Sequence, residues 1–373
     1  MAGIPRLPYV ARALSKLFFP DYPIITGVTA VGVTRKIQVV GNSTFVVSLP
    51  KNWVRMFGLR QGDEVVIEPL ADGSLRLFPF REGRGDHLVT EVTVRCGDDV
   101  TLVTRRIIAH YLAGANEIRV RLSDRGCSNL AEALVNVVRD KILGVEILDQ
   151  TNDLITLYTV LDREFTDFEV VVRKLFKAVR FMAEALIAGL EEGNVTVLEN
   201  VFRRDDLVDK LYLFILRYLT ECLLTLKADM KFAPPETLHL LLASKSVERL
   251  ADHVAAIALH ALSIVRSGRA EILEPVMPLL RDIPSLLGKL SQAFINLSPA
   301  DAEEVIIMAK EGKMREKRVR SKCLSEGTPP ELSYMLESVR RIYAYAVDIA
   351  EAVIDVAAIR SLRLSASGEE AVK

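Results

Sequence analysis

From about residue 168 to residue 362, apolar side chains recur every three or four positions over segments too long to be strands. This spacing predicts amphipathic helices, each with one apolar face turned toward a core. Half of the chain is apolar but only 6% is aromatic, so that core must be built mainly from aliphatic side chains. Six helices are predicted, over approximately residues 168–192, 197–227, 236–266, 272–296, 300–320 and 331–362.

The order of these predicted helices repeats after roughly 100 residues, which indicates an internal duplication. The loops between them are short, and short loops place consecutive helices antiparallel. Each half is therefore predicted to be a three-helix bundle. Pro275, Pro278 and Pro284 predict a break or a kink in the fourth helix, because proline removes a helix hydrogen bond and clashes with the preceding turn.

Two of the predicted helices carry pairs of carboxylates beside their apolar stripes: Asp205 with Asp209, and Glu248 with Asp252. Residues four apart lie one above the other, so each pair opposes helix formation by roughly 0.2–0.5 kcal/mol. A bound cation would relieve this repulsion, since carboxylate oxygens are hard ligands. The alternatives are a solvated charged face, or pairing with the nearby cations Arg203, Arg204, Lys210 and Arg249.

The segment 34–84 is predicted to be a compact ββαββ unit. Gly41 and Asn42 suit a hairpin turn between two strand-forming segments, and Pro50 ends the second strand and suits the first turn of a helix. Gly58 can take the left-handed position after that helix, with Leu59 folding back toward Val54. A second hairpin follows around residues 72–73. So small a sheet cannot cover both its faces and its edges, which favours two chains that interleave their strands.

The residues "GNSTFVVSLPKNWVRMFGLRQGDEV" within this unit resemble the AbrB/SpoVT/MazE-type swapped-hairpin domain. The resemblance implies an intertwined homodimer that usually binds DNA, here through Arg35, Lys36, Lys51 and Arg55. Basic groups on phosphates would supply affinity but little sequence information. The alternative is a domain that serves only for dimerisation.

In the helical part, "DDLVDKLY" followed by "SVERLADHVAAIA" resembles one repeat of the PhoU family of phosphate-uptake regulators. The resemblance implies two three-helix repeats and a metal cluster, of iron or zinc with magnesium as an alternative, held by Asp205, Asp209, Glu248 and Asp252. The second repeat departs from this pattern. Aligning "SVERLADH" with "SVRRIYAY" places Arg340 and Ala344 opposite the acidic pair, so Arg340 is expected to repel a cation or to pair with an acid such as Glu337.

Between these parts, residues 86–165 alternate strand and helix patterns without a phosphate-binding loop, and are predicted to form a small α/β connector domain. The predicted fold class is thus multidomain α+β, with an N-terminal swapped-hairpin β domain, a small α/β middle segment and a C-terminal all-α double three-helix bundle. The two resemblances together imply an archaeal-type architecture. The predicted layout is an extension that can be disordered (1–33), the hairpin domain (34–84), the connector (86–165), repeat 1 (167–267), a degenerate repeat 2 (270–362) and a tail (363–373).

The four cysteines are scattered without CxxC spacing, which argues against a zinc ribbon or a disulfide framework and for a reducing cytoplasm. No apolar run is long enough to cross a membrane, so contact with a membrane is expected to be peripheral at most. Residues 1–84 hold 11 Lys and Arg against 6 Asp and Glu, whereas the whole chain has a net charge of −1. A basic first part on an acidic remainder favours nucleic acid at one end, with a solvated surface as the alternative.

Together these features predict a cytoplasmic regulator of phosphate homeostasis that binds DNA and whose helical body senses or relays phosphate status. The alternative is an adaptor without DNA binding, which docks on a phosphate transporter ATPase or a sensor kinase and uses the hairpin domain only to dimerise. No nucleophile and base are placed together in the sequence, so an enzyme is not expected.

Overall fold

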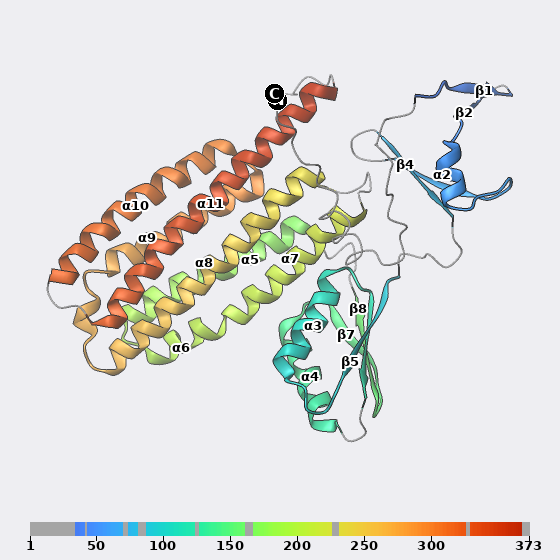
Figure 1. Cartoon of the computed structure of the whole chain (residues 1–373). Coiled ribbons are helices and arrows are strands. Elements are labelled where there is room, and N and C mark those ends of the chain that lie inside the picture. Colours follow the sequence, from blue (N-terminus) through green and yellow to red (C-terminus); the bar gives the residue numbers. More distant parts are fainter. Residues whose placement is uncertain are drawn as a thin grey trace, which may run out of the picture. The chain divides into compact units, whose positions relative to one another are not determined.

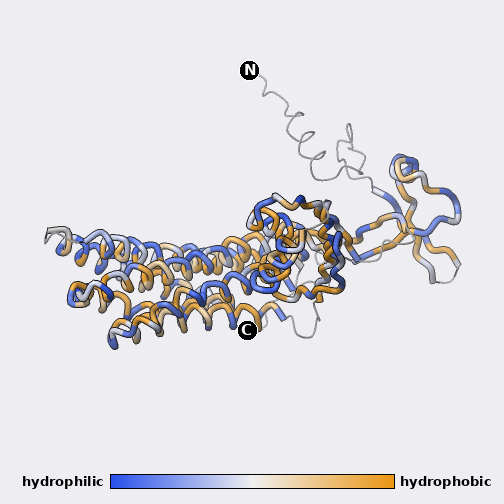
Figure 2. Tube along the Cα trace, turned by 90° about the horizontal axis from the view of Figure 1, so that it is seen from below, coloured by the Kyte–Doolittle hydropathy of each residue, from blue (hydrophilic) through white to orange (hydrophobic). Residues whose placement is uncertain are grey.

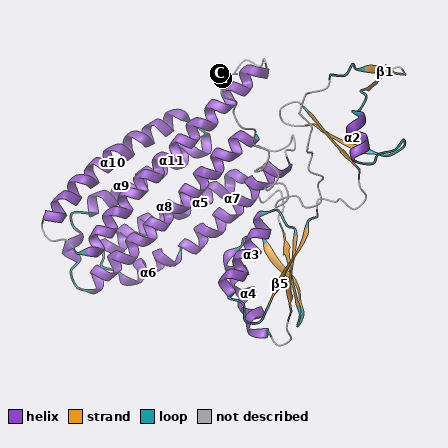
Figure 3. Ribbon diagram, in the orientation of Figure 1, coloured by secondary structure: helices purple, strands orange, loops and turns teal. Residues whose placement is uncertain are grey.

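The computed structural model of the 373-residue chain describes residues 34–41, 43–69, 74–80, 87–123, 127–160, 167–225, 231–325 and 329–367. The predicted extension over residues 1–33 lies outside the described residues, as do the turn residues 42 and 72–73 and the end of the predicted tail. Figure 3 shows helices throughout the C-terminal part, and strands in the N-terminal unit and within residues 87–160.

The N-terminal unit has the predicted ββαββ order. Strands β1 (Gln38–Val40) and β2 (Thr44–Val46) form an antiparallel hairpin, followed by helix α2 (Lys51–Met56) and by the paired strands β3 (Val65–Pro69) and β4 (Leu75–Pro79). Pro50 caps α2, and Gly58 takes a φ of 66° behind it. The amide of Leu59 then donates to the carbonyl of Val54 at 3.0 Å, which confirms the predicted helix end.

Residues 87–160 form a four-stranded sheet in the order β5-β6-β8-β7. The elements are β5 (Val89–Val94), α3 (Val100–Leu112), β6 (Glu117–Leu122), α4 (Ser128–Lys141), β7 (Val145–Gln150) and β8 (Leu154–Thr159). β5 and β6 are parallel, and β8 runs antiparallel to both β6 and β7. Both helices cover the same face of the sheet (Figure 1), and along β6 buried Ile118, Val120 and Leu122 alternate with exposed arginines. The predicted alternation of strands and helices is confirmed.

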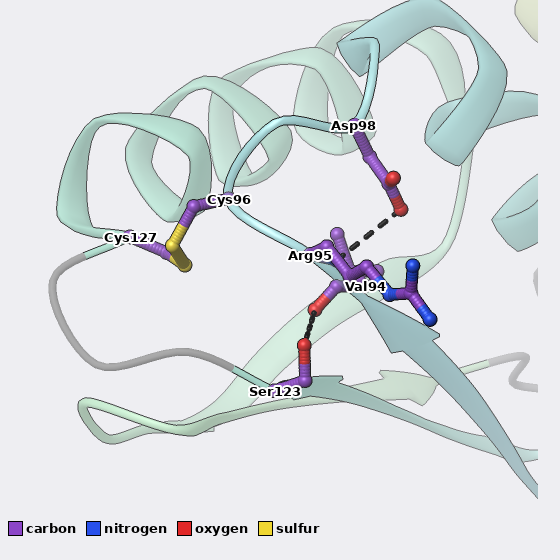
Figure 4. The surroundings of a disulfide bond; sticks show 6 residues. All are labelled: Val94, Arg95, Cys96, Asp98, Ser123 and Cys127. Carbon is purple, nitrogen blue, oxygen red and sulfur yellow. Dashed lines mark hydrogen bonds between the residues drawn. A yellow bond between two sulfur atoms is a disulfide. The ribbon is translucent and has the colours of Figure 1, made fainter.

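A disulfide joins Cys96, just after β5, to Cys127 at the N-terminus of α4 (Figure 4). The expectation that the cysteines do not pair is therefore wrong for these two. They are 31 residues apart in the sequence, and only the parallel pairing of β5 with β6 brings their Cα atoms to 5.0 Å. Cys222 and Cys323 are buried and form no disulfide with a described residue.

The C-terminal part consists of long helices that lie side by side, as Figure 1 shows. They fall into a first set of four, α5 to α8, and a second set of three, α9 to α11. In the first set, α5 and α8 fall close to the predicted ranges, but the second predicted helix is divided at Arg204 into α6 and α7. In the second set, the predicted disturbance by proline is present as a short 3-10 turn, η1, before α9, whereas Pro284 lies inside α9. The helices are α5 (Phe168–Glu191), α6 (Val195–Arg203), α7 (Asp205–Thr225), α8 (Pro234–Arg266), η1 (Ala270–Leu273), α9 (Met277–Asn296), α10 (Pro299–Ser325) and α11 (Pro330–Ser367).

One aliphatic core runs through both sets of helices. Figure 2 shows hydrophobic and hydrophilic residues alternating along each helix, as expected when one face is buried. The predicted stripe on α8 is confirmed, because each of its members is buried: Val247, Leu250, Ala251, Val254, Ile257 and Ala258. None of the described helices is both long enough and apolar enough to cross a lipid bilayer.

Candidate functional site

The four carboxylates named from the sequence lie close together, where α7 packs on α8. Asp205 begins α7, and an acid in the first turn is favoured by the partial positive charge of the helix N-terminus. Asp209 follows one turn later, and both face Glu248 and Asp252 of the neighbouring helix, with which they interact electrostatically. The structure therefore brings together two pairs that are about 40 residues apart in the sequence.

Burial and mutual repulsion disfavour the charged forms of these acids. Burial is the main cause that raises the pKa of Asp205 to about 7, and the charges of Asp252, Asp209 and Glu248 add to it. Burial, followed by the charge of Glu248, raises the pKa of Asp252 to about 6. The pKa of Asp209 is raised for the same two reasons. A cluster of this kind responds to any positive charge that approaches it.

Two cations on α8 offset part of this repulsion. The Lys245 ammonium lies 2.6 Å from Glu248 Oε1, and Arg249 lies 3.5 Å from Asp252 Oδ2. Of the cations suggested by the sequence, only Arg249 therefore pairs with a member of the cluster. Arg204 instead stacks over the ring of Phe181. Lys245 was missed, although its position three residues before Glu248 is a spacing that pairs charges on a helix.

Asp205 Oδ1 and Glu248 Oε2 are buried oxygens that accept no hydrogen bond from a described residue, and Arg249 Nε lies 3.8 Å from Glu248 Oε2. Such oxygens are the hard donors that a divalent or trivalent cation requires. Within the described ranges, however, no three His, Cys, Asp or Glu side chains are arranged to hold a metal ion. The donor set suits a cation, and the placement of the side chains does not form a coordination shell around one.

The α/β segment meets the helical body beside this cluster. Lys141, the last residue of α4, lies 2.6 Å from Asp206, and its charge also acts on Asp205 and Asp209. Lys210 of α7 donates to the carbonyl of Arg139 at 3.1 Å rather than to a carboxylate. Sequence reasoning could not find Lys141, because nothing in the sequence places the end of α4 against α7.

The second set of helices has a different charge at the corresponding place. Arg340 of α11 pairs with Glu337 at 2.8 Å, as expected, and Ala344 lies one turn further along. Arg320 and Arg341 contact the same Glu337 carboxylate. The structure thus has an acidic cluster between α7 and α8, and a basic one between α10 and α11.

In the N-terminal unit, the four candidate DNA contacts are all exposed. Arg35 and Lys36 precede β1, and Lys51 and Arg55 lie one turn apart on α2. Spacing of four places the two helix residues on one face, where both can reach a polyanion.

The same unit exposes many large apolar side chains. Phe45 is 74% exposed and Ile37 71%, and α2 contains no buried residue. A surface this apolar is unusual for a monomer. The large apolar side chains that the unit exposes are Ile37, Val39, Val40, Phe45, Val46, Val47, Met56, Ile67, Leu75 and Phe80.

Family models match two regions of the chain. Residues 172–261 match the PhoU domain, and residues 38–84 match the domain described as "Antidote-toxin recognition MazE, bacterial antitoxin". Comparison with curated proteins finds no significant match. Among solved structures, the phosphate transport system regulatory protein PhoU from Streptococcus pneumoniae aligns with 16% identity and a TM-score of 0.42, over 51% of this chain and 93% of that one. The chain therefore has a PhoU-type helical domain preceded by an N-terminal domain of the MazE/AbrB type.

Proposed function

We propose that the protein regulates phosphate uptake by binding DNA as a homodimer, with the helical body relaying the signal. The observation that carries this proposal is the presence of the PhoU match and the MazE match in one chain. The PhoU domain is the feature that supports phosphate uptake as the process, and the MazE-type domain is the feature that supports DNA as the partner.

The N-terminal unit would supply both dimerisation and contact with DNA. Its exposed apolar residues would be covered by the same residues of a second chain, because neither hairpin can bury them alone. Arg35, Lys36, Lys51 and Arg55 would then contact phosphates from both chains. Phosphate contacts give affinity that depends strongly on salt and little on sequence.

The helical body would respond through the carboxylate cluster. Asp205, Asp209, Glu248 and Asp252 would supply the oxygen ligands of an iron, zinc or magnesium ion, and such an ion would neutralise their repulsion. Because Lys141 of the α/β segment lies beside the cluster, a change of charge there would act on the contact between α4 and α7.

A salt titration of DNA binding tests the proposal. The logarithm of the binding constant for genomic DNA fragments should fall linearly with the logarithm of salt concentration. Replacing Lys51 and Arg55 by alanine should weaken binding to all fragments and flatten this slope by about one unit for each phosphate that is no longer neutralised. A matched control, Glu64→Gln, alters charge in the same unit without removing a cation. Binding that is independent of salt and of Lys51 and Arg55 would contradict the proposal.

A second candidate function is an adaptor that docks on a phosphate transporter or a signalling kinase. The exposed apolar side chains of the N-terminal unit favour the adaptor, because such a surface can contact a different protein as well as a second copy of this chain. The matched family is itself described by recognition of another protein. Absence of DNA binding together with retained dimerisation would select the adaptor.

A further inference from the structure

A pocket of about 550 Å³ lies between α10 and α11, in the second set of helices. It is lined by residues of these two helices alone. Its walls hold five cationic side chains, two carboxylates and one methyl group: Lys313, Lys317, Arg320, Arg340, Arg341, Glu316, Glu337 and Ala344. Its volume lies in the range of small-ligand sites, about 300–1,000 Å³.

The cations of this basic pocket outnumber its anions. Glu337 accepts from three guanidinium groups, those of Arg320, Arg340 and Arg341. One carboxylate cannot satisfy three guanidiniums, each of which has five N–H donors. Within the described part of the chain, Lys313 and Lys317 take part in no ion pair. The pocket therefore has an excess of three positive charges and more N–H donors than its two carboxylates can accept.

The interior of the pocket is anchored by a buried acid. Glu316 is only 2% exposed, and its Oε1 accepts from Arg320 at 2.7 Å. This contact holds the Arg320 side chain in place between two carboxylates, Glu316 and Glu337. A guanidinium fixed in this way is ready to bind without further loss of side-chain freedom.

The pocket occupies the place that the carboxylate cluster holds in the first set of helices. Both lie between the last two helices of their set, and in "SVRRIYAY" Arg340 takes the position that Glu248 has in "SVERLADH". Lys313 and Lys317 are four residues apart, as are Asp205 and Asp209. The equivalent position in the second set thus carries basic groups in place of acidic ones. It can therefore hold an anion rather than a cation.

From this charge and shape we infer that the basic pocket binds a small, multiply charged oxyanion of the phosphate class, either inorganic or as part of a phosphorylated metabolite. Guanidinium groups fit the oxygens of such anions in pairs, and lysine adds a point charge. An excess of three charges calls for a ligand with two or more negative charges. The concave shape and the confinement of the lining to two helices favour a small molecule over DNA.

This inference deepens the proposed function, since anion binding would give the helical body a direct means of sensing phosphate. Only the role of the anion as a phosphate signal rests on the proposed function; the binding itself does not. Anion binding and DNA binding are measured separately on the same preparations. Loss of DNA binding with retained anion binding would reject the proposed function and leave the pocket intact as a site. The reverse result would reject the site alone.

Calorimetric titration of the full chain tests the inference at about 0.15 M salt, where long-range fields are screened beyond about 8 Å. The probes are inorganic phosphate, pyrophosphate and ATP, with citrate as a carboxylate of similar charge. At least one phosphate probe should bind with one site per chain and more tightly than citrate. Replacing both Lys313 and Lys317 by glutamine should weaken that binding about tenfold or more, because each lysine contributes a charge-assisted contact.

A matched control removes the same charge from the same helix. Lys310 and Arg318 of α10 are exposed and do not line the pocket, so Lys310→Gln with Arg318→Gln should leave the affinity unchanged. Neither lysine of the test pair forms an ion pair with a described residue, and circular dichroism should show both double variants folded. If no phosphate probe binds, if citrate binds equally well, or if the control loses as much affinity as the test pair, the inference is wrong.

Discussion

Arg217 of α7 donates to the carbonyl oxygen of Ala115, 2.9 Å away, and also to the carbonyls of Tyr111 and Gly114. These three carbonyls lie at the C-terminal end of α3, where a helix carries partial negative charge. Arg217 is only 3% exposed. A buried cation held by main-chain carbonyls thus joins the helical body to the α/β segment, and burial lowers its pKa.

Replacing Arg217 by alanine should destabilise the chain by about 2 kcal/mol, because three carbonyls at the end of α3 lose their donor. It should also let the α/β segment unfold apart from the helices. Chemical denaturation followed by two probes, one in each part, would show the separation as two transitions. Arg203→Ala is a suitable control, since Arg203 is exposed and has no partner among the described residues, and should change the stability by no more than about 0.5 kcal/mol. A single transition in the Arg217 variant would contradict this role.

The full chain should sediment as a dimer or a larger oligomer through its N-terminal unit. Phe45→Asp with Val39→Asp would place charges in the apolar surface and should lower the sedimenting mass, because an unpaired charge is costly to bury. Ile307→Asp on α10 is the control, as Ile307 is also an exposed apolar residue, at 57%, but lies in the helical body. An unchanged mass in the double variant would place the dimer contact elsewhere.

The stability of the helical body should fall as the pH rises from about 4 to about 7. Asp205 has a pKa of about 7 in the folded chain against 3.8 when unfolded, so the folded state holds the proton more tightly and is favoured at the acidic end of this window. Asp205→Asn should flatten the dependence and raise the stability at pH 8 by on the order of 1 kcal/mol. Asp206 is one residue away and more exposed, so Asp206→Asn should leave the pH dependence of the stability in place. A stability that rises between about pH 4 and pH 7 would contradict the raised pKa of Asp205 in the folded chain.

A metal ion, if bound, should occupy the first set of helices only. Glu248→Gln with Asp252→Asn keeps the shape of the site and removes two charges, so elemental analysis of the purified chain should show the metal content falling to near zero. Arg340 and Ala344 in the second set offer no donor to a cation, and Arg340→Ala should leave the metal content unchanged. Metal retained by the double variant, or a wild-type chain purified without chelator that holds none, would reject the site.

Thiol labelling should reveal two different kinds of cysteine. The chain denatured without reductant should label at Cys222 and Cys323 only, and after reduction at all four cysteines. Replacing Cys96 and Cys127 by serine should destabilise the α/β segment by about 4 kcal/mol, since the bond closes a loop of about 31 residues in the unfolded chain. Cys222→Ser tests instead the burial of a cysteine outside the disulfide. Four labelled thiols without reductant would exclude the disulfide.

The sequence alone determined the local elements, because their causes are local. The apolar stripe of α8, the helix end at Gly58 and Leu59, and the order of strands and helices in residues 87–160 follow from periodicity and backbone preference. The carboxylate pairs that begin at Asp205 and Glu248 could be identified from the sequence. Like charges four residues apart on a helix are unfavourable, so their presence indicates a compensating interaction. The division at Arg204 was missed, since no proline or glycine marks it.

Tertiary structure alone decided which distant residues meet. The disulfide requires β5 to lie beside β6, the Arg217 contacts require α7 to lie at the end of α3, and the place of Lys141 beside the carboxylates depends on the same packing. The basic pocket likewise arises because α10 and α11 bring five cations to one concave surface. Contacts of this kind depend on the burial of apolar faces far apart in the chain, which no local preference specifies.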